Sequence, residues 1–161
     1  MGHFLTGLIG APSALARIAA ESGAPSPTGL PFDLAIIPLG HVQLDRLTGG
    51  QAFNYRDGFT YLSQELEAGI IQRAPEARLL YVETEYFGGT GGQGAALFEC
   101  GQVVWRGVES TDQPKGGRSP ISEGLSCLGV APAPYSDEFD SVGLIRFRSM
   151  KALGLIDNDG D

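Results

Sequence analysis

The clearest periodic pattern of the chain is helical and lies in its middle third. Apolar residues recur there at spacings of three and four, which places them along one face of a helix. The pattern predicts a helix over residues 58–73, ended by Pro75. Its apolar face would carry Phe59, Leu62, Leu66 and Ile70.

A strict alternation over residues 78–87 follows this helix and predicts a β-strand. Successive side chains of a strand point to opposite faces, so the alternation separates two sets of residues. One face would carry Leu80, Val82, Thr84 and Tyr86, and the other Tyr81, Glu83, Glu85 and Phe87.

Three further segments predict strands. The isoleucine-rich run at 34–39 is typical of a short buried strand. Residues 95–99 and 103–108 flank a short turn and predict a β-hairpin. Residues 144–149 alternate and predict a last strand.

Three shorter helices complete the pattern. Residues 13–22 form an apolar-faced segment that Gly23 ends, and residues 41–47 predict one or two helical turns. Ser119 followed by Pro120 is a typical helix start, because the serine caps the helix and proline fits its first position. The elements together predict an α+β fold in which helices pack on a small, largely antiparallel sheet. We expect residues 1–156 to form a single globular domain and 157–161 an acidic, frayed tail.

The charge balance narrows the class of partner. The 161 residues include 19 acidic and 11 basic ones, a formal net charge of -8. Such a chain repels phosphate backbones and anionic membranes, so we expect neither nucleic acid nor a membrane as partner. A basic protein is the partner that the charge favours, although acidity can also serve solubility alone.

The cysteines and the apolar runs indicate a cytoplasmic protein. No apolar run reaches eighteen residues, and the N-terminus does not resemble a signal peptide. Cys100 and Cys127 are too few for a zinc site, and two free thiols fit a reducing compartment. The sequence leaves a single disulfide between them open.

The acidic side chains of the 78–87 strand are the first candidate site. Glu83 and Glu85 share a face with Tyr81 and Phe87. Paired carboxylates can divide acid and base roles, but two glutamates on one strand more often form a solvated face. Aromatic neighbours favour a third interpretation, a surface that binds a partner.

The glycine-rich segment at 88–94 is the second candidate. It contains a G-x-G-x-x-G pattern, whose residues Gly89, Thr90, Gly91 and Gln93 would lie in a loop open to a small ligand. A dinucleotide site requires a helix directly after this pattern, and the predicted hairpin leaves no room for one. We therefore expect a structural loop and no nucleotide cofactor.

The third candidate is the acidic cluster of Asp137, Glu138 and Asp140. It could contact a cation or a basic partner, or simply mark the start of a helix, where negative charge is favourable. The twelve-residue calcium loop of an EF-hand is absent, and we expect no metal. No G-x-S-x-G elbow and no evident Cys–His pair appear, so we assign no catalytic residue.

Two stretches carry a resemblance. Residues 81–91, with the sequence YVETEYFGGTG, and residues 137–144, DEFDSVGL, resemble a group of small uncharacterised bacterial proteins over roughly residues 77–148. In size, acidity and fold style the chain also resembles immunity proteins of bacterial polymorphic toxin systems. Neither resemblance implies particular site residues.

The leading hypothesis is therefore a cytoplasmic immunity protein that neutralises a basic toxin domain by covering it. The binding surface would comprise Tyr81, Glu83, Glu85 and Phe87, with Asp137, Glu138 and Asp140 as a second patch. Two alternatives remain: a small enzyme or small-molecule binder that uses the 88–94 loop with Glu83 and Glu85, and a structural subunit of a homo-oligomer.

Overall fold

The computed structural model describes residues 2–114 and 117–155. Six strands form one sheet in the order β2-β3-β1-β4-β5-β6, and every neighbouring pair is antiparallel. This confirms the predicted α+β class. The strands are β1 (His3–Gly10), β2 (Thr28–Leu30), β3 (Leu34–Pro38), β4 (Leu79–Phe87), β5 (Thr90–Glu99) and β6 (Gln102–Ser110). The helices are α1 (Pro12–Ser22), α2 (His41–Thr48), α3 (Gln64–Arg73), α4 (Pro120–Cys127) and α5 (Glu138–Ser141), with 3₁₀ turns η1 (Leu144–Arg146) and η2 (Met150–Leu153).

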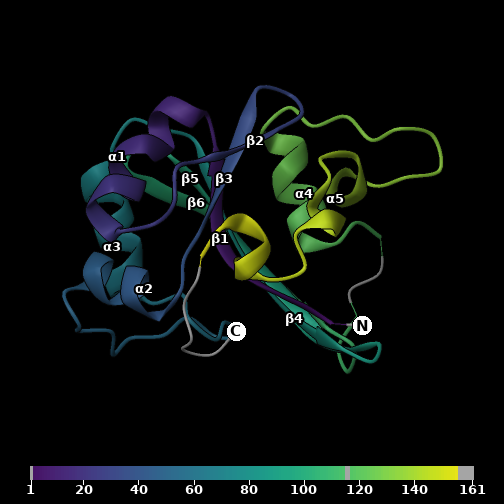
Figure 1. The fold of residues 1–161 in the computed structure, drawn as a ribbon. Helices are drawn as coiled ribbons and strands as arrows, with labels where there is room; N and C mark the ends of the chain where they lie inside the picture. The colour runs from purple at the N-terminus through teal and green to yellow at the C-terminus, as the bar shows by residue number, and fades with distance from the viewer. Residues whose placement is uncertain (1, 115–116, 156–161) are drawn as a thin grey trace.

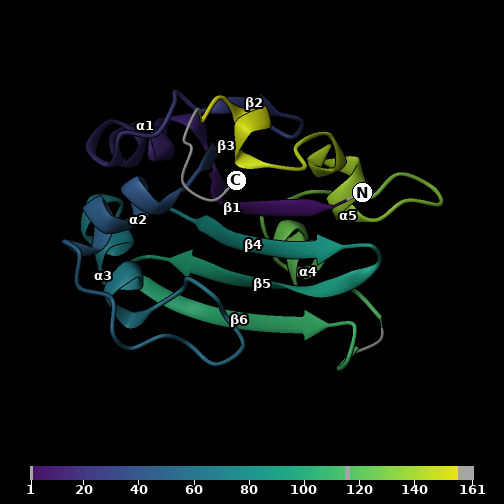
Figure 2. The same cartoon turned by 60° about the horizontal axis from the view of Figure 1, so that its bottom comes forward.

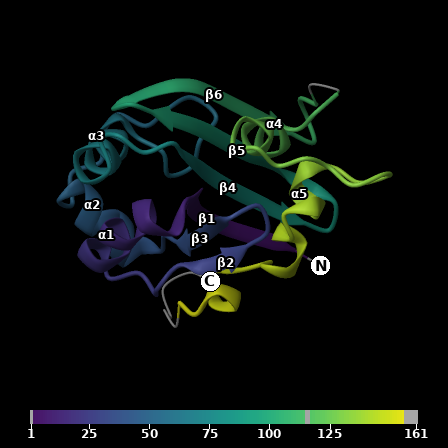
Figure 3. The ribbon, with the colours of Figure 1, turned by 90° about the horizontal axis from the view of Figure 1, so that it is seen from above.

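The sheet separates two hydrophobic cores (Figures 1 and 3). One core packs α1, α2 and α3 on one face, with Leu8, Tyr81 and Phe98 pointing toward the helices. The other packs α4, α5 and the C-terminal turns on the opposite face, against Leu80 and Leu97. No helix among the described residues has the length and apolar character needed to cross a membrane.

Strand β1 was not predicted, although it lies in the interior of the sheet between β3 and β4. Seven of its eight residues are buried, so it shows no alternation of apolar and polar positions. Two of its glycines sit where other backbone or side chains come close. A Cβ atom at Gly7 would lie 2.6 Å from the carbonyl oxygen of Ile37, and one at Gly10 would lie 2.5 Å from Leu79. Close packing thus requires glycine at these two positions, and glycine weakens the pattern of side chains by which a strand is recognised in a sequence.

The predicted helix over 58–73 is correct only in its second half. Helix α3 begins after Ser63, whose hydroxyl accepts a hydrogen bond from the Leu66 amide. Residues 58–62 are not helical, because Thr60 and Tyr61 donate their amides to the Glu83 carboxylate instead. Phe59 and Leu62 still enter the core, so their apolar spacing reflects burial rather than helix.

The predicted last strand over 144–149 is wrong. Residues 144–146 form the η1 turn, and Ser149 makes only an isolated bridge to Phe4. Leu144 is buried in the second core, whereas Arg146 and Arg148 are exposed. The alternation in the sequence therefore reflects one buried residue followed by solvent-facing arginines.

The remaining predictions around the hairpin agree with the structure. Strands β5 and β6 form the predicted hairpin, and Ser119 caps α4. The 88–94 segment differs from the prediction, since β5 already begins at Thr90 and only Gly88 and Gly89 form the turn, both with positive φ. No helix follows the glycine pattern. Cys100 and Cys127 are exposed and unpaired, and the 157–161 tail lies outside the described residues.

Candidate functional site

A trough of about 400 Å³ lies on the α1–α3 face of the sheet. In Figure 2 these helices gather toward the left end of the strands, whereas the β4–β5 turn lies at the right. The trough occupies the end of β4, β5 and β6 near this turn, with residues 58–61 as one wall. It is lined by Phe4, Gly58, Thr60, Tyr61, Glu83, Thr84, Glu85, Phe87, Thr90, Gly91, Gly92, Gln93, Glu109 and Ser110.

Glu83 anchors the wall of the trough to its floor. Its carboxylate accepts hydrogen bonds from the backbone amides of Thr60 and Tyr61 and, at 2.6 Å, from the hydroxyl of Tyr81. The side chain is 7% exposed. Three donors occupy most of the roughly four acceptor positions of a carboxylate. Glu83 therefore supplies negative charge to the trough but little free hydrogen-bonding capacity.

Tyr81 does not belong to a binding surface, contrary to the prediction. It is fully buried between the sheet and the helices, with its ring near that of Phe59. Burial, together with the neighbouring Glu83 carboxylate, holds the pKa of the Tyr81 hydroxyl well above its usual range. Its hydroxyl stays protonated and donates to Glu83, which is a structural role.

Glu85 and Phe87 are exposed, as the prediction of a binding face requires. The side chain of Glu85 has no hydrogen bond or ion pair with any other described residue. The side chain of Phe87 is 72% exposed, and on the neighbouring strand that of Phe4 is 41% exposed. The carboxylate thus lies open to solvent next to two accessible aromatic rings.

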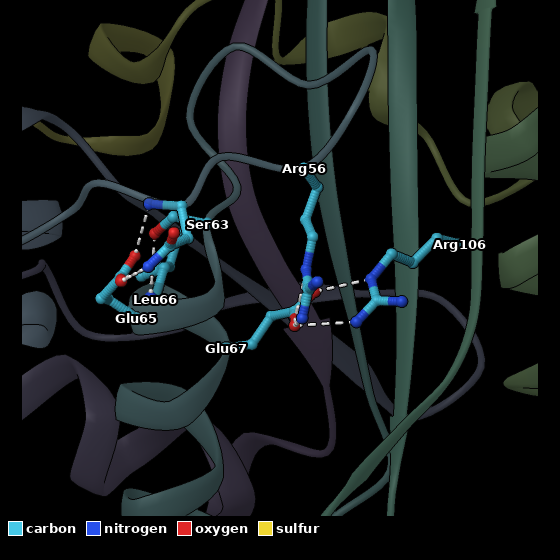
Figure 4. A network of polar contacts seen from close by, with 7 residues as sticks. Arg56, Ser63, Glu65, Leu66, Glu67 and Arg106 are labelled. Atoms are coloured by element: carbon cyan, nitrogen blue, oxygen red, sulfur yellow. Dashed lines mark hydrogen bonds and ion pairs between the residues drawn. The ribbon is translucent and has the colours of Figure 1, made fainter.

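The wall continues into an irregular strap, residues 53–61, which two further glutamates hold in place (Figure 4). Glu67 on α3 is buried and binds both Arg56 of the strap, at 2.6 Å, and Arg106 of β6, at 2.7 Å. Although burial opposes the charge, the two arginines lower the pKa of Glu67. Glu65 accepts hydrogen bonds from the amides of residues 53 and 54, and the bonds to Asn54 lower its pKa to about 2. Both carboxylates remain charged near neutral pH and keep the strap fixed.

Glycines on β5 leave the floor of the trough without side chains. Gly92 lies opposite Glu85 in the register, and Gly94 lies opposite Glu83. A Cβ atom at Gly94 would come 2.5 Å from the ring of Phe59, which packs closely against the strand at this point. Of the other residues in the predicted glycine loop, Thr90 and Gly91 line the trough. The side-chain amide of Gln93 bonds to Tyr86 and to the Ile121 amide of α4, on the opposite face.

The second predicted patch cannot join the first. Helix α5 packs on the α4 side of the sheet, so Asp137, Glu138 and Asp140 lie across the sheet from the trough. The Asp137 carboxylate caps α5 by accepting a hydrogen bond from the Asp140 backbone amide. Glu138 is 2% exposed and pairs with Arg118, so it does not present a free charge. The cluster thus begins a helix, which was one of its expected interpretations, and only Asp137 and Asp140 are exposed.

Glu83 and Glu85 do not form a pair with two accessible carboxylates. The acceptors of Glu83 are largely occupied, and Glu85 is a solvated carboxylate. A pair that divides acid and base roles requires two different environments around accessible oxygens. Within the described ranges no group of three or more His, Cys, Asp or Glu residues is placed to hold a metal ion.

The sequence did not reveal several residues of the trough. Phe4 lies on the unpredicted strand β1, and Thr60 and Tyr61 were expected inside a helix. The contacts of Thr60 and Tyr61 use backbone amides, which leave no side-chain pattern. For Phe4, an apolar run near the N-terminus, followed by glycines, is the only available signal.

Comparisons with protein-family models, with curated proteins and with solved structures found no match for this chain. The resemblance of residues 77–148 to small bacterial proteins therefore stays a prediction, and the function of the chain must be argued from its own geometry.

Proposed function

We propose that this chain is a binding protein whose trough receives a basic segment of a protein partner. In the version that the resemblance favours, the partner is a toxin and the chain is its immunity protein, which covers the basic active surface of the toxin. Occlusion requires a rigid, complementary surface and no chemistry on the partner.

The charge of the trough carries the proposal. Glu83 and Glu85 line it, and none of the described residues that line it is Lys, Arg or His. Charges of one sign around a recess raise the local concentration of oppositely charged groups and accelerate encounter. The field of this recess favours a cation.

The rim and the wall support a protein partner. Phe4 and Phe87 offer exposed aromatic area of the kind that anchors protein interfaces. The strap between α2 and α3 is held by Glu65, Glu67 and Glu83, so its shape is set before binding. A preformed surface loses less conformational entropy when a partner binds.

The trough also supports a small cationic ligand as a second candidate, because it is concave and about 400 Å³ in volume. The two candidates differ in area. A protein partner must cover Phe87 and the outer strap, whereas a small ligand would leave Phe87 largely exposed.

The test compares charge reversal inside and outside the trough. Immobilised wild-type chain, Glu85→Lys and Glu76→Lys would be exposed to extract of the native cell, and the captured protein identified and purified. Glu76 precedes β4, at the end of the strand away from Glu85, and provides a matched control. We expect Glu85→Lys to slow association at least tenfold at low salt and Glu76→Lys to change it less than twofold. Equal association rates for the two variants would refute the proposal.

A further inference from the structure

We infer that the group seated in the trough is the guanidinium of an arginine side chain. This deepens the proposed function and rests on it, since the arginine would belong to the partner. The inference comes from one open carboxylate and two aromatic rings that line the same end of the trough.

Glu85 and Phe4 form a close cross-strand pair. They lie directly opposite each other on β4 and β1. The Phe4 amide donates at 2.7 Å to the carbonyl of Arg148, on the side of β1 away from β4. The pair is therefore of the non-hydrogen-bonded kind, in which opposing side chains approach most closely. The two side chains therefore leave the sheet side by side, and both line the trough.

Phe87 provides the second ring. It lies two residues beyond Glu85 on the same strand face. The Phe4 ring leans along β1 toward Gly2, because a Cβ atom at Gly2 would lie only 2.6 Å from the ring edge. Gly2 precedes His3, which pairs with Tyr86, so Gly2 lies at the end of β4 that carries Phe87. The ring thus leans in the direction of Phe87. Neither ring stacks on another aromatic ring of the described chain, and both line the trough with part of their surface exposed.

The third side is open. Gly92 is the residue opposite Glu85 on β5 and has no side chain to cover the carboxylate. Glu83 is occupied by three donors, whereas neither oxygen of Glu85 contacts another side chain or amide among the described residues, which leaves both for a bidentate contact.

A guanidinium fits this arrangement better than an ammonium. It is planar, presents two parallel N–H groups to a carboxylate, and stacks on aromatic faces. It is also more weakly hydrated than a lysine ammonium, so it loses less hydration free energy when it contacts two phenyl rings. A lysine would be attracted by the charge alone.

The experiment uses three probes of the same backbone: the N-acetyl amides of arginine, lysine and citrulline. Citrulline keeps the planar shape without the charge. Amide chemical shifts of the ¹⁵N-labelled full chain would be followed during titration. We expect saturable shifts at Glu85, Gly92 and their neighbours with a millimolar Kd for arginine, binding at least threefold weaker for lysine, and none for citrulline.

Variants separate stacking from charge. Phe87→Leu keeps an apolar side chain but removes the ring, and should weaken arginine about threefold while leaving lysine nearly unchanged. Glu85→Gln should abolish the binding of both cations, and Glu76→Gln should leave both unchanged. Equal affinity for arginine and lysine, equal loss of both in Phe87→Leu, or no saturable shift with arginine would each overturn the inference.

The outcome is distinguishable from failure of the proposed function. If a captured partner depends on Glu85 but the arginine probe does not bind, the guanidinium assignment is wrong and the protein-binding proposal stands. If the arginine probe binds as described but partner association ignores Glu85→Lys, the trough takes guanidinium compounds and the protein-binding proposal fails.

Discussion

Removal of the Glu83 carboxylate should loosen the wall of the trough and destabilise the whole chain by about 3 kcal/mol. In Glu83→Ala the Tyr81 hydroxyl remains fully buried without an acceptor, which costs about 1–3 kcal/mol. The amides of Thr60 and Tyr61 also lose a charged acceptor. Since Thr60 is exposed and Tyr61 half-buried, water can replace part of that loss, and we assign these two bonds about 1 kcal/mol together.

The assay combines stability with local exchange. Urea unfolding should show the loss of about 3 kcal/mol, which for a chain of this size lowers Tm by roughly 6–12 °C. Hydrogen exchange at the Thr60 and Tyr61 amides should accelerate, because a side chain provides their hydrogen bonds. Glu85→Ala is the matched control on the same strand face and should stay within about 0.5 kcal/mol of wild type.

A double variant tests the cause. Tyr81→Phe removes the hydroxyl itself and should cost about 1 kcal/mol. In Tyr81→Phe with Glu83→Ala no hydroxyl is left without an acceptor, so the combined loss should be about 1 kcal/mol, roughly 3 kcal/mol less than the sum of the single losses. Strict additivity, or unchanged exchange at residues 60 and 61, would refute the anchoring role of Glu83.

Three further predictions concern other parts of the molecule. Glu67→Gln should cost about 2 kcal/mol of unfolding free energy at pH 7, because it removes the negative charge between Arg56 and Arg106, each of which is about a third exposed. The pKa of Glu67 is lowered from 4.5, so the difference in unfolding free energy between variant and wild type, measured in urea, should shrink as the pH falls below 4.5. Burial lowers the pKa of His3 below 6.5, so the unfolded chain binds a proton at this residue more readily than the folded chain does. The free energy of unfolding should therefore decrease as the pH falls below 6.5, and an NMR titration of the imidazole should give a pKa under that value. Gly94→Ala should cost about 1–3 kcal/mol by displacing the Phe59 ring, whereas Gly29→Ala, with no atom within 4 Å of its Cβ position, should be nearly neutral. Equal melting temperatures for the two variants would contradict the close packing of Phe59 on Gly94.

Local rules predicted the elements whose signals are local. The cap of α4, the β5–β6 hairpin and the β3 run follow from neighbouring residues and appear where expected. The β1 strand and the strap do not, because tertiary contacts decide them. Gly7 and Gly10 are required by close neighbours on β3 and β4, and residues 60 and 61 leave the helical pattern for a carboxylate on a distant strand.

The site was predictable to a similar extent. Alternation along β4 correctly placed Glu83 and Glu85 on one face, but it could not tell that helices cover Tyr81 and the strap covers Glu83, leaving Glu85 open. Charge alone grouped Asp137 and Asp140 with these glutamates, whereas the sheet separates them. Burial and the choice of face are properties of the assembled layers, which a single strand pattern does not contain.

The position of β1 also determines when the trough can exist during synthesis. Strands β4, β5 and β6 are joined by two-residue turns and can pair as soon as they are made, but β1 pairs across a long separation: His3 and Thr84, which share a hydrogen bond, lie 81 positions apart. Contacts of that span form late, since a long loop must close first. Phe4 therefore comes to lie beside Glu85 only after strands β4, β5 and β6 have left the ribosome. A nascent or truncated chain that lacks β1 or these three strands does not form the trough. A partner that binds this recess therefore meets it only after β1 has paired with β4.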